Sequence, residues 1–198
     1  MLKGSWWQDR LVLTTAAYGI NKRNIVASTG ATLPDGTPIS VLYGTQASRG
    51  FEVEATYHPI ANWQIQAGGT YIDAYVTNSN LPATYQARLN MVPRQSGNVW
   101  TRYNVPKGPL KGLGVGLGVI YVSSRLGVIT NIPSQYLAVP SYALVNPAVY
   151  YQWRRFSFGL NVTNALDRKY ILSSDLAAST SIVPGEPRKM SFSVRTSF

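Results

Sequence analysis

Hydrophobic and polar residues alternate with a period of two along most of this chain. In residues 51–57 apolar side chains occupy every second position, and the glutamates Glu52 and Glu54 lie between them. The same alternation recurs in residues 10–26, 63–71, 113–121, 156–163 and 190–198. Side chains spaced in this way point to opposite faces of an extended strand. The pattern predicts an all-β protein, because no segment shows the period of an amphipathic helix.

The connections between the predicted strands alternate between short and long. Short, turn-like breaks lie at residues 8–9, 58–62, 106–111 and 153–155, and longer polar stretches lie near 27–43, 77–93, 125–139 and 164–186. Outer-membrane β-barrels have this order, with short turns on the periplasmic side and long loops outside. About nine strands of roughly ten residues or more are expected, which is the length that crosses a bilayer at a tilt. The sequence therefore predicts an antiparallel up-and-down transmembrane β-barrel.

Composition narrows the possible functions. The 198 residues include 13 tyrosines and 5 tryptophans, only 13% are charged, and no apolar run approaches the ~18 residues of a membrane-spanning helix. Without cysteine, neither a disulfide nor a thiolate metal site is possible. The net charge of +10 suits an anionic partner, but the basic residues are dispersed, so solvated loop charges explain it equally well.

Both the strand number and the N-terminus indicate an incomplete barrel. Bacterial single-chain barrels have even numbers of strands and no open edge within lipid, and nine strands do not fit that rule. The first residues also lack the apolar segment and cleavage site of a secretory signal. We expect the N-terminal part of the barrel to be missing, with Met1 as an internal or misassigned start.

Three short motifs resemble TonB-dependent outer-membrane receptors, especially the siderophore class. They are SRGFEVE at 48–54 followed by residues 63–74, FGLNVTNALDRKY at 158–170, and PGEPR at 184–188 before the last strand. They occur in the family's order and spacing, and the resemblance covers essentially residues 1–198. It implies the C-terminal portion, about nine strands, of a 22-stranded barrel domain.

The resemblance also implies a function and a set of partners. Receptors of this type bind ferric siderophores from outside, and energy passed through the TonB complex rearranges an N-terminal plug domain. Neither the plug nor the TonB-contacting segment is expected within these residues, so the chain alone should not transport. The implied location is the outer membrane of a Gram-negative bacterium, in contact with lipid and lipopolysaccharide. No protein cofactor and no nucleic-acid partner are expected.

The final strand resembles the signal read by the barrel assembly machinery. Its apolar face carries Met190, Phe192, Val194, Thr196 and Phe198. Elsewhere, the residues expected to face the lumen are Glu52, Glu54, Gln64, Gln66, Asn161 and Arg195, with hydration of the interior as their simplest role. Candidates for aromatic girdles at the two membrane interfaces are Trp63, Tyr71, Tyr121, Tyr151 and Trp153.

Ligand contacts are expected on the long loops. A chelated iron needs no protein metal ligand, so aromatic and polar side chains facing outward are the relevant groups, and cations there attract an anionic chelate. The candidates are Tyr85, Arg88, Arg125, Gln135 and Tyr136. Contacts with lipopolysaccharide phosphates, or simple solvation, are the alternatives for these positions.

An enzyme is not expected. The single histidine, His58, precedes a proline in a short turn, which excludes a multi-histidine metal site. Glu52 and Glu54 share a face about 7 Å apart, a spacing that glycoside hydrolysis can use but that a polar barrel wall also produces. Two further alternatives remain: a complete porin-like barrel of eight or ten strands, and a soluble all-β module that binds carbohydrate or single-stranded nucleic acid.

Overall fold

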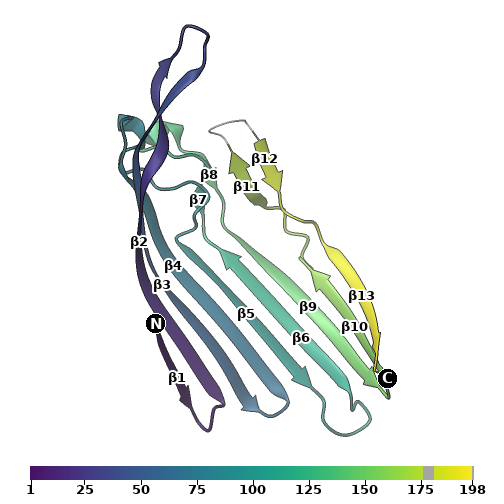
Figure 1. The fold of residues 1–198 in the computed structure, drawn as a ribbon. Coiled ribbons are helices and arrows are strands. Elements are labelled where there is room, and N and C mark those ends of the chain that lie inside the picture. The colour runs from purple at the N-terminus through teal and green to yellow at the C-terminus, as the bar shows by residue number, and fades with distance from the viewer. Residues whose placement is uncertain (176–180, 198) are drawn as a thin grey trace.

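The fold is one curved antiparallel sheet of nine strands with long loops at one end (Figure 1). The computed structural model describes residues 1–175 and 181–197. Its elements are β1 (Leu2–Trp6), β2 (Leu11–Thr32), β3 (Pro38–Ile60), β4 (Trp63–Asn78), η1 (Pro82–Thr84), β5 (Gln95–Asn104), β6 (Leu113–Val122), β7 (Arg125–Leu126), η2 (Pro133–Gln135), β8 (Ala138–Val139), β9 (Tyr142–Trp153), β10 (Phe156–Thr163), β11 (Ile171–Asp175), β12 (Ser181–Pro184) and β13 (Lys189–Thr196). Across these two ranges, no helix is long and apolar enough to cross a membrane.

The strands follow one another as a meander. The order in the main sheet is β1-β2-β3-β4-β5-β6-β9-β10-β13, and the pairs β7-β8 and β11-β12 form two small separate sheets within the loops. The strands β1 and β13 lie at opposite edges, and no pairing between them occurs among the described residues. This open sheet confirms the predicted partial barrel and lacks the closure that a complete small porin requires.

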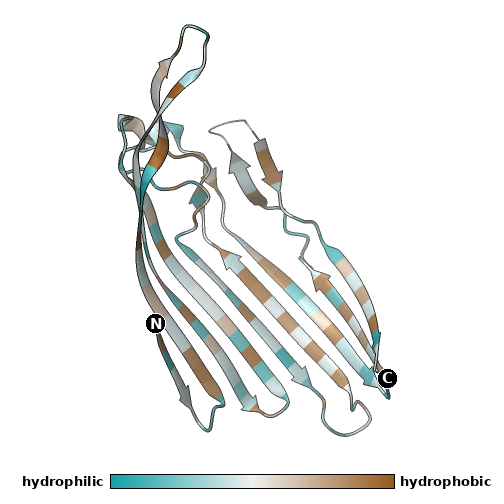
Figure 2. Ribbon diagram, viewed as in Figure 1, coloured by the Kyte–Doolittle hydropathy of each residue, from teal (hydrophilic) through white to brown (hydrophobic). Residues whose placement is uncertain are grey.

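The register gives the sheet one apolar and one polar face. Leu117 of β6, for example, lies opposite Thr101 of β5 and Pro147 of β9, and the apolar stripes continue across neighbouring strands (Figure 2). The residues predicted to face the lumen all fall on the opposite, polar face: Glu52, Glu54, Gln64, Gln66, Asn161 and Arg195. A face this apolar disfavours the soluble module, because water would contact the exposed rows of valine, leucine and phenylalanine.

The predicted girdle residues lie on the apolar face in two rows. Trp63, Tyr151 and Trp153 are near the short turns, whereas Tyr71 and Tyr121 are near the long loops. Eight residue steps separate Trp63 from Tyr71, about 26 Å along the strand and roughly 20 Å of height at a tilt of about 40°. This height is slightly less than the apolar band of about 25 Å in outer-membrane barrels, so the two rows lie near opposite edges of that band.

The prediction of a long loop near residues 27–43 is wrong. There β2 and β3 remain paired as far as Thr32 opposite Pro38, so the two strands continue as a hairpin that rises above the other loops (Figure 1). Its turn is tight: Asp35 Oδ1 accepts a hydrogen bond from the Thr37 amide at 2.9 Å, and Gly36 has a φ of +86°. The β-branched residues on both sides favour strand over loop, and the Pro-Asp-Gly sequence supplies the turn.

Candidate functional site: the long-loop cluster

The three long connections that follow β4, β6 and β10 lie at the same end of the sheet (Figure 1). The β4–β5 connection folds back along β4, because the amides of Gln86 and Leu89 donate to the carbonyl oxygens of Val76 and Ala74, both at 3.0 Å. Further on, the Met91 amide donates to Leu126 O of the β6–β9 connection at 2.7 Å. These backbone bonds make the first two long loops one connected body.

Two of the predicted ligand residues occupy equivalent positions in this body. Tyr85 follows η1 and Tyr136 follows η2, and each amide closes its turn by donating to a proline carbonyl, that of Pro82 or Pro133. Both tyrosines have extended backbones and are exposed, at 45% and 47%. The two rings therefore project from matching turns on adjacent loops.

Asn131 joins the two turns. Its side-chain amide donates to the carbonyl oxygens of Pro82 and Tyr85, both at 2.9 Å, and its backbone amide donates to Ala83 O at 2.7 Å. One residue of the β6–β9 loop thus satisfies three carbonyl groups of η1 and its cap. Since each bond fixes η1 relative to the second loop, Asn131 sets the placement of Tyr85.

Arg88 is a half-buried cation in the same cluster. Burial lowers the pKa of its guanidinium, and the nearby charge of Arg94 lowers the pKa further. Asp73 and Tyr136 act in the opposite direction, and Asp73 also forms an ion pair with Arg94 at 3.3 Å. A partly desolvated cation close to a tyrosine from the other loop is a suitable group for attracting an anion.

Arg125 differs from the other predicted ligand residues because it is buried, with 4% exposure. Its Nη2 donates to Ile171 O at 2.7 Å and Leu172 O at 3.2 Å, and its guanidinium lies 5.5 Å from the ring centre of Tyr142. These contacts join β7 to β11, so Arg125 holds the β6–β9 and β10–β13 loops together. Gln135, in contrast, is exposed, and its Oε1 accepts a bond from Thr130 Oγ1 at 3.1 Å.

Asn164 organises the start of the β10–β13 connection. It is 1% exposed, and its Nδ2 donates to Arg168 O at 2.9 Å and Glu186 O at 3.0 Å. Its Oδ1 accepts from the Arg168 amide, and Asp167 Oδ1 accepts from the Arg188 amide at 2.9 Å. The motifs 158–170 and 184–188, separate in sequence, thus meet as one hydrogen-bonded unit just before β13.

Sequence reasoning did not single out Asn131 or give a role to Asn164. A signal for the paired turns was present: residues 81–87, LPATYQA, and 132–138, IPSQYLA, share an apolar residue, proline, tyrosine and alanine at the same spacing. That internal repeat marks both tyrosines as members of one kind of turn. No comparable pattern marks Asn131, whose role depends on a contact between distant segments.

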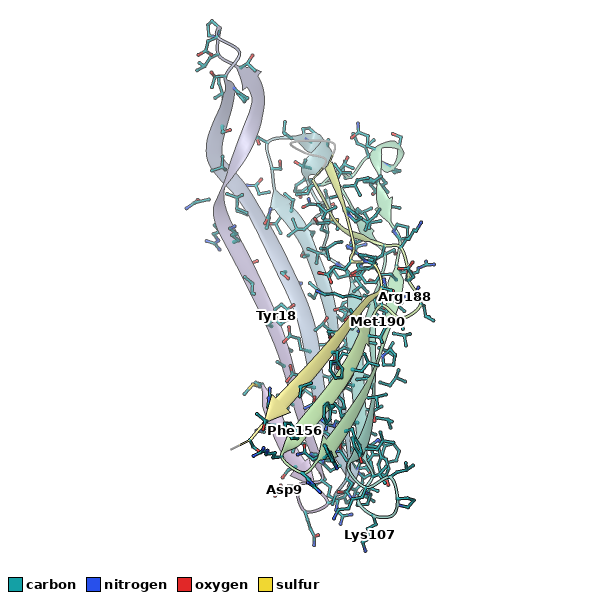
Figure 3. All side chains as sticks on the ribbon, turned by 90° about the vertical axis from the view of Figure 1, so that its right-hand side faces the viewer. Asp9, Tyr18, Lys107, Phe156, Arg188 and Met190 are labelled. Carbon is teal, nitrogen blue, oxygen red and sulfur yellow. The ribbon has the colours of Figure 1, made fainter. Side chains whose placement is uncertain are left out.

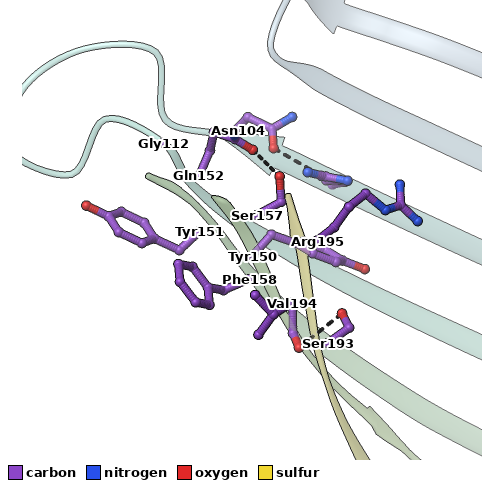
Figure 4. A pocket seen from close by; sticks show the side chains of 12 residues that line it. Asn104, Gly112, Tyr150, Tyr151, Gln152, Ser157, Phe158, Ser193, Val194 and Arg195 are labelled. Atoms are coloured by element: carbon purple, nitrogen blue, oxygen red, sulfur yellow. Dashed lines mark hydrogen bonds between the residues drawn. The ribbon is translucent and has the colours of Figure 1, made fainter. Parts of the chain in front are cut away.

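A second, polar site lies on the inner face near the short turns (Figure 4). It is a cavity of about 670 Å³ between β5, β9, β10 and β13. Arg102 stacks over the Tyr150 ring at 4.1 Å and donates from Nε to Asn104 Oδ1 at 3.0 Å. Ser157 Oγ bonds to Gln152 Oε1, and the Arg195 side chain extends from β13. The polar face of the main sheet therefore offers charged and amide groups to whatever fills the lumen.

The predicted assembly signal lies at the edge of the sheet. Met190, Phe192, Val194 and Thr196 occupy the apolar face of β13 opposite Val162, Leu160, Phe158 and Phe156. Phe192 and Phe158 stack with ring centres 6.4 Å apart. Phe198, the last residue of the predicted signal, lies outside the described residues. Recognition of these side chains by an assembly machinery stays a prediction.

The main nine-stranded sheet, which we call the wall, has one lipid-compatible face, two aromatic rows and long loops gathered at one end. These features define an outer-membrane barrel protein. Residues 2–165 match the family described as TonB dependent receptor-like, beta-barrel. The chain belongs to this family, as the sequence motifs predicted. Its members are receptors and transporters of the Gram-negative outer membrane, and this location is therefore confirmed.

Individual relatives support the assignment. The chain is 32% identical over 173 residues to the ferrichrome outer membrane transporter/phage receptor of Escherichia coli K12, covering 84% of this chain and 22% of the relative. It is 31% identical over 163 residues to the ferrioxamine B receptor of Salmonella typhimurium, covering 80% and 22%. The structure of the pyoverdine outer membrane receptor FpvA from Pseudomonas aeruginosa PAO1 bound to pyoverdine superposes with a TM-score of 0.79 at 25% identity, covering 99% and 28%. The chain spans about a quarter of the length of the curated relatives it matches.

Proposed function

We propose that residues 1–198 form the C-terminal nine strands of a 22-stranded barrel in a TonB-dependent receptor for ferric siderophores. The open sheet supports this proposal, because within residues 1–175 and 181–197 the strands β1 and β13 each pair on one side only, and further strands would complete their free edges. The two curated relatives named above are a ferrichrome transporter/phage receptor and a ferrioxamine B receptor, and the matched region covers only 22% of each.

The observation that carries the ligand proposal is the pair of matching turns that present Tyr85 and Tyr136. Their rings supply flat contact surfaces, and Arg88 between the loops supplies the charge that attracts an anionic ferric chelate. Gln135 contributes a side-chain amide from the same turn as Tyr136. Arg125 acts on the ligand site through the loops it joins, since its guanidinium is buried.

The proposed partners follow from the two faces and two ends of the wall. The inner face, with Arg102, Arg195 and the two strand glutamates, contacts a plug domain, and that domain contacts the TonB complex. The outer face contacts membrane lipid, and the loop end contacts lipopolysaccharide. The edge strand β13 is recognised by the barrel assembly machinery. We propose no catalytic role, no cofactor and no nucleic-acid partner.

Ligand binding is tested on the full-length receptor that carries this chain, with a panel of ferric siderophores. Tyr85→Ala and Tyr136→Ala are each expected to weaken binding of the cognate chelate about tenfold, equivalent to about 1.4 kcal/mol. Arg88→Gln is expected to weaken anionic chelates about fivefold and neutral ones little, because it removes only the charge. Arg23→Gln, the same charge loss on the β2–β3 hairpin, serves as the control. Equal affinities in Arg88→Gln and the control would contradict the role of Arg88.

The extent of the receptor is tested separately by sequencing upstream of the codon for Met1. A plug-encoding segment, in frame or displaced by a frameshift, is expected there. An upstream region with no such segment contradicts the proposed architecture, whatever the binding panel shows.

A further inference from the structure

The outer face carries an apolar groove next to the short turns. It has a volume of about 500 Å³, and its lining comes from four adjacent strands, β3 to β6: Ile60, Trp63, Thr101, Tyr103, Val115 and Leu117. Thr101 is the small residue at its centre, opposite Ile65 and Leu117 in the register, while Trp63 and Tyr103 lie opposite each other. The Thr101 hydroxyl accepts a bond from Trp63 Nε1 at 2.8 Å, so the polar atom at the centre already has a partner. The groove therefore suits a hydrocarbon chain.

Cationic side chains lie at the same end of the sheet as this groove. Lys107 and Lys111 are exposed in the turn that joins β5 to β6, two of the strands that line the groove, and Figure 3 shows Lys107 below the strands. The neighbouring β9–β10 turn adds Arg154 and Arg155. In the described ranges the one ion pair is Arg94–Asp73, which lies near the long loops, so none of these four cations forms an ion pair with a described carboxylate.

The two arginines lie against the membrane-facing side of the wall. Arg154 stacks over Trp153 at 5.4 Å and Arg155 over Phe156 at 5.5 Å, and both rings belong to the apolar face. Their charge is therefore held beside the lower aromatic row, at the level of lipid headgroups. Turn geometry does not require an arginine there: Arg154 has a φ of +52°, which favours Asn or Gly.

We propose that this end of the wall, which we call the basic rim (Lys107, Lys111, Arg154 and Arg155), binds an anionic phospholipid of the periplasmic leaflet. One acyl chain occupies the groove between Trp63 and Leu117, and Lys107 and Lys111 contact the phosphate. Basic clusters beside a membrane-spanning wall attract anionic headgroups in this way. The inference rests on the outer-membrane orientation, with the short turns in the periplasm, and not on siderophore transport.

The test counts lipids that remain bound to the full-length receptor, purified in mild detergent and analysed by native mass spectrometry. Phosphatidylglycerol and phosphatidylethanolamine are supplied in equal amounts. The wild-type protein is expected to retain the anionic lipid at least fivefold over the zwitterionic one. The double variant Lys107→Gln/Lys111→Gln is expected to lose that preference, whereas Lys22→Gln/Arg23→Gln, an equal charge loss on the hairpin, keeps it.

A second variant separates the groove from the charge. Thr101→Leu fills the centre of the groove, and it is expected to reduce retention of both lipids while the remaining preference for the anionic one persists. Heat-modifiable migration on gels confirms that each variant forms the barrel. The proposal is overturned if the double variant retains phosphatidylglycerol as the control does, or if millimolar inorganic phosphate displaces the lipid completely, which would indicate a simple anion site. Siderophore uptake is measured in parallel, so failure of transport and failure of lipid binding are recorded independently.

Discussion

The wall and the long-loop cluster are held together by different kinds of interaction. In the wall, continuous hydrogen-bonded ladders pair the backbones of neighbouring strands, and the side chains face lipid and the lumen in alternation. In the loops, single side chains such as Asn131, Asn164 and Arg125 bond to the carbonyl groups of distant segments. The loss of one polar side chain from the wall should therefore be tolerated, whereas the loss of one loop amide should disorder a whole connection.

Replacing Asn164 is the strongest test of this difference. Asn164→Ala removes two donors and one acceptor from a buried position with a φ of +51°, so we expect a loss of about 2–4 kcal/mol. Asn104→Ala on the inner wall breaks one exposed bond to Arg102 and should cost less than about 1 kcal/mol. Denaturant unfolding of the full-length receptor in micelles measures both. Similar losses would remove the distinction between wall and loops.

Arg125 provides the next test, with a matched surface arginine as its control. Arg125→Met keeps most of the buried volume but loses the bonds to Ile171 and Leu172, so we expect a cost of about 1–3 kcal/mol. Arg94→Met breaks an exposed ion pair, worth about 0–1 kcal/mol. Hydrogen exchange of the β11 amides should accelerate in the first variant alone. Unchanged exchange with weaker ligand binding would instead make Arg125 a direct ligand contact.

Two glycines probe how tightly the wall itself is packed. A Cβ at Gly118 would lie 2.9 Å from Cε3 of Trp100, because that indole lies across the glycines of β6. Gly118→Ala should therefore cost about 1 kcal/mol and alter the near-ultraviolet circular dichroism of the tryptophan. At Gly69 the nearest atom, Val53 Cγ1, is 3.6 Å away, so Gly69→Ala should be neutral or stabilise by about 0.5 kcal/mol. A destabilised Gly69→Ala variant would show that strand glycines matter for reasons other than space.

The smallest expected effect concerns the hairpin turn and depends on pH. The Thr37 amide stabilises ionised Asp35 and lowers the pKa of the carboxyl group below its ordinary value of 3.8. The contribution to turn stability is therefore complete above that value and lost as pH falls through the lowered pKa. The chemical shift of the Thr37 amide should follow this titration, and Asp35→Asn should abolish it. A shift centred above pH 3.8 would reverse the sign of the interaction.

The wall was predictable from sequence because apolar side chains, which face lipid, alternate with polar side chains, which face the lumen. The alternation in residues 51–57, 63–71 and 113–121 fixed both the strands and the face on which each side chain lies. The hairpin was mispredicted, since polar residues such as Thr32 and Ser40 occur in loops and also in strands with water on both sides. A ribbon that leaves the membrane has no apolar face for periodicity to reveal.

The candidate site was only partly predictable. Exposed tyrosines and a cation on adjacent loops could be proposed from composition and position, and Tyr85, Arg88 and Tyr136 do lie on two bonded loops. The burial of Arg125 could not be predicted, because it depends on β11 lying against β7 across 46 residues of sequence. Contact with a siderophore stays a prediction, which the binding panel addresses, for all five candidates: Tyr85, Arg88, Arg125, Gln135 and Tyr136.

The hairpin formed by β2 and β3 is the part of the described chain that extends farthest beyond the long-loop end of the sheet (Figure 1). A bilayer crossing needs about 10 residues, so the remaining 12 or so residues of β2 extend about 40 Å along the strand, which is roughly 30 Å of height at a tilt of about 40°. A large particle that approaches from outside therefore meets the tip at Asp35 and Gly36 before it meets the loop cluster (Figure 1).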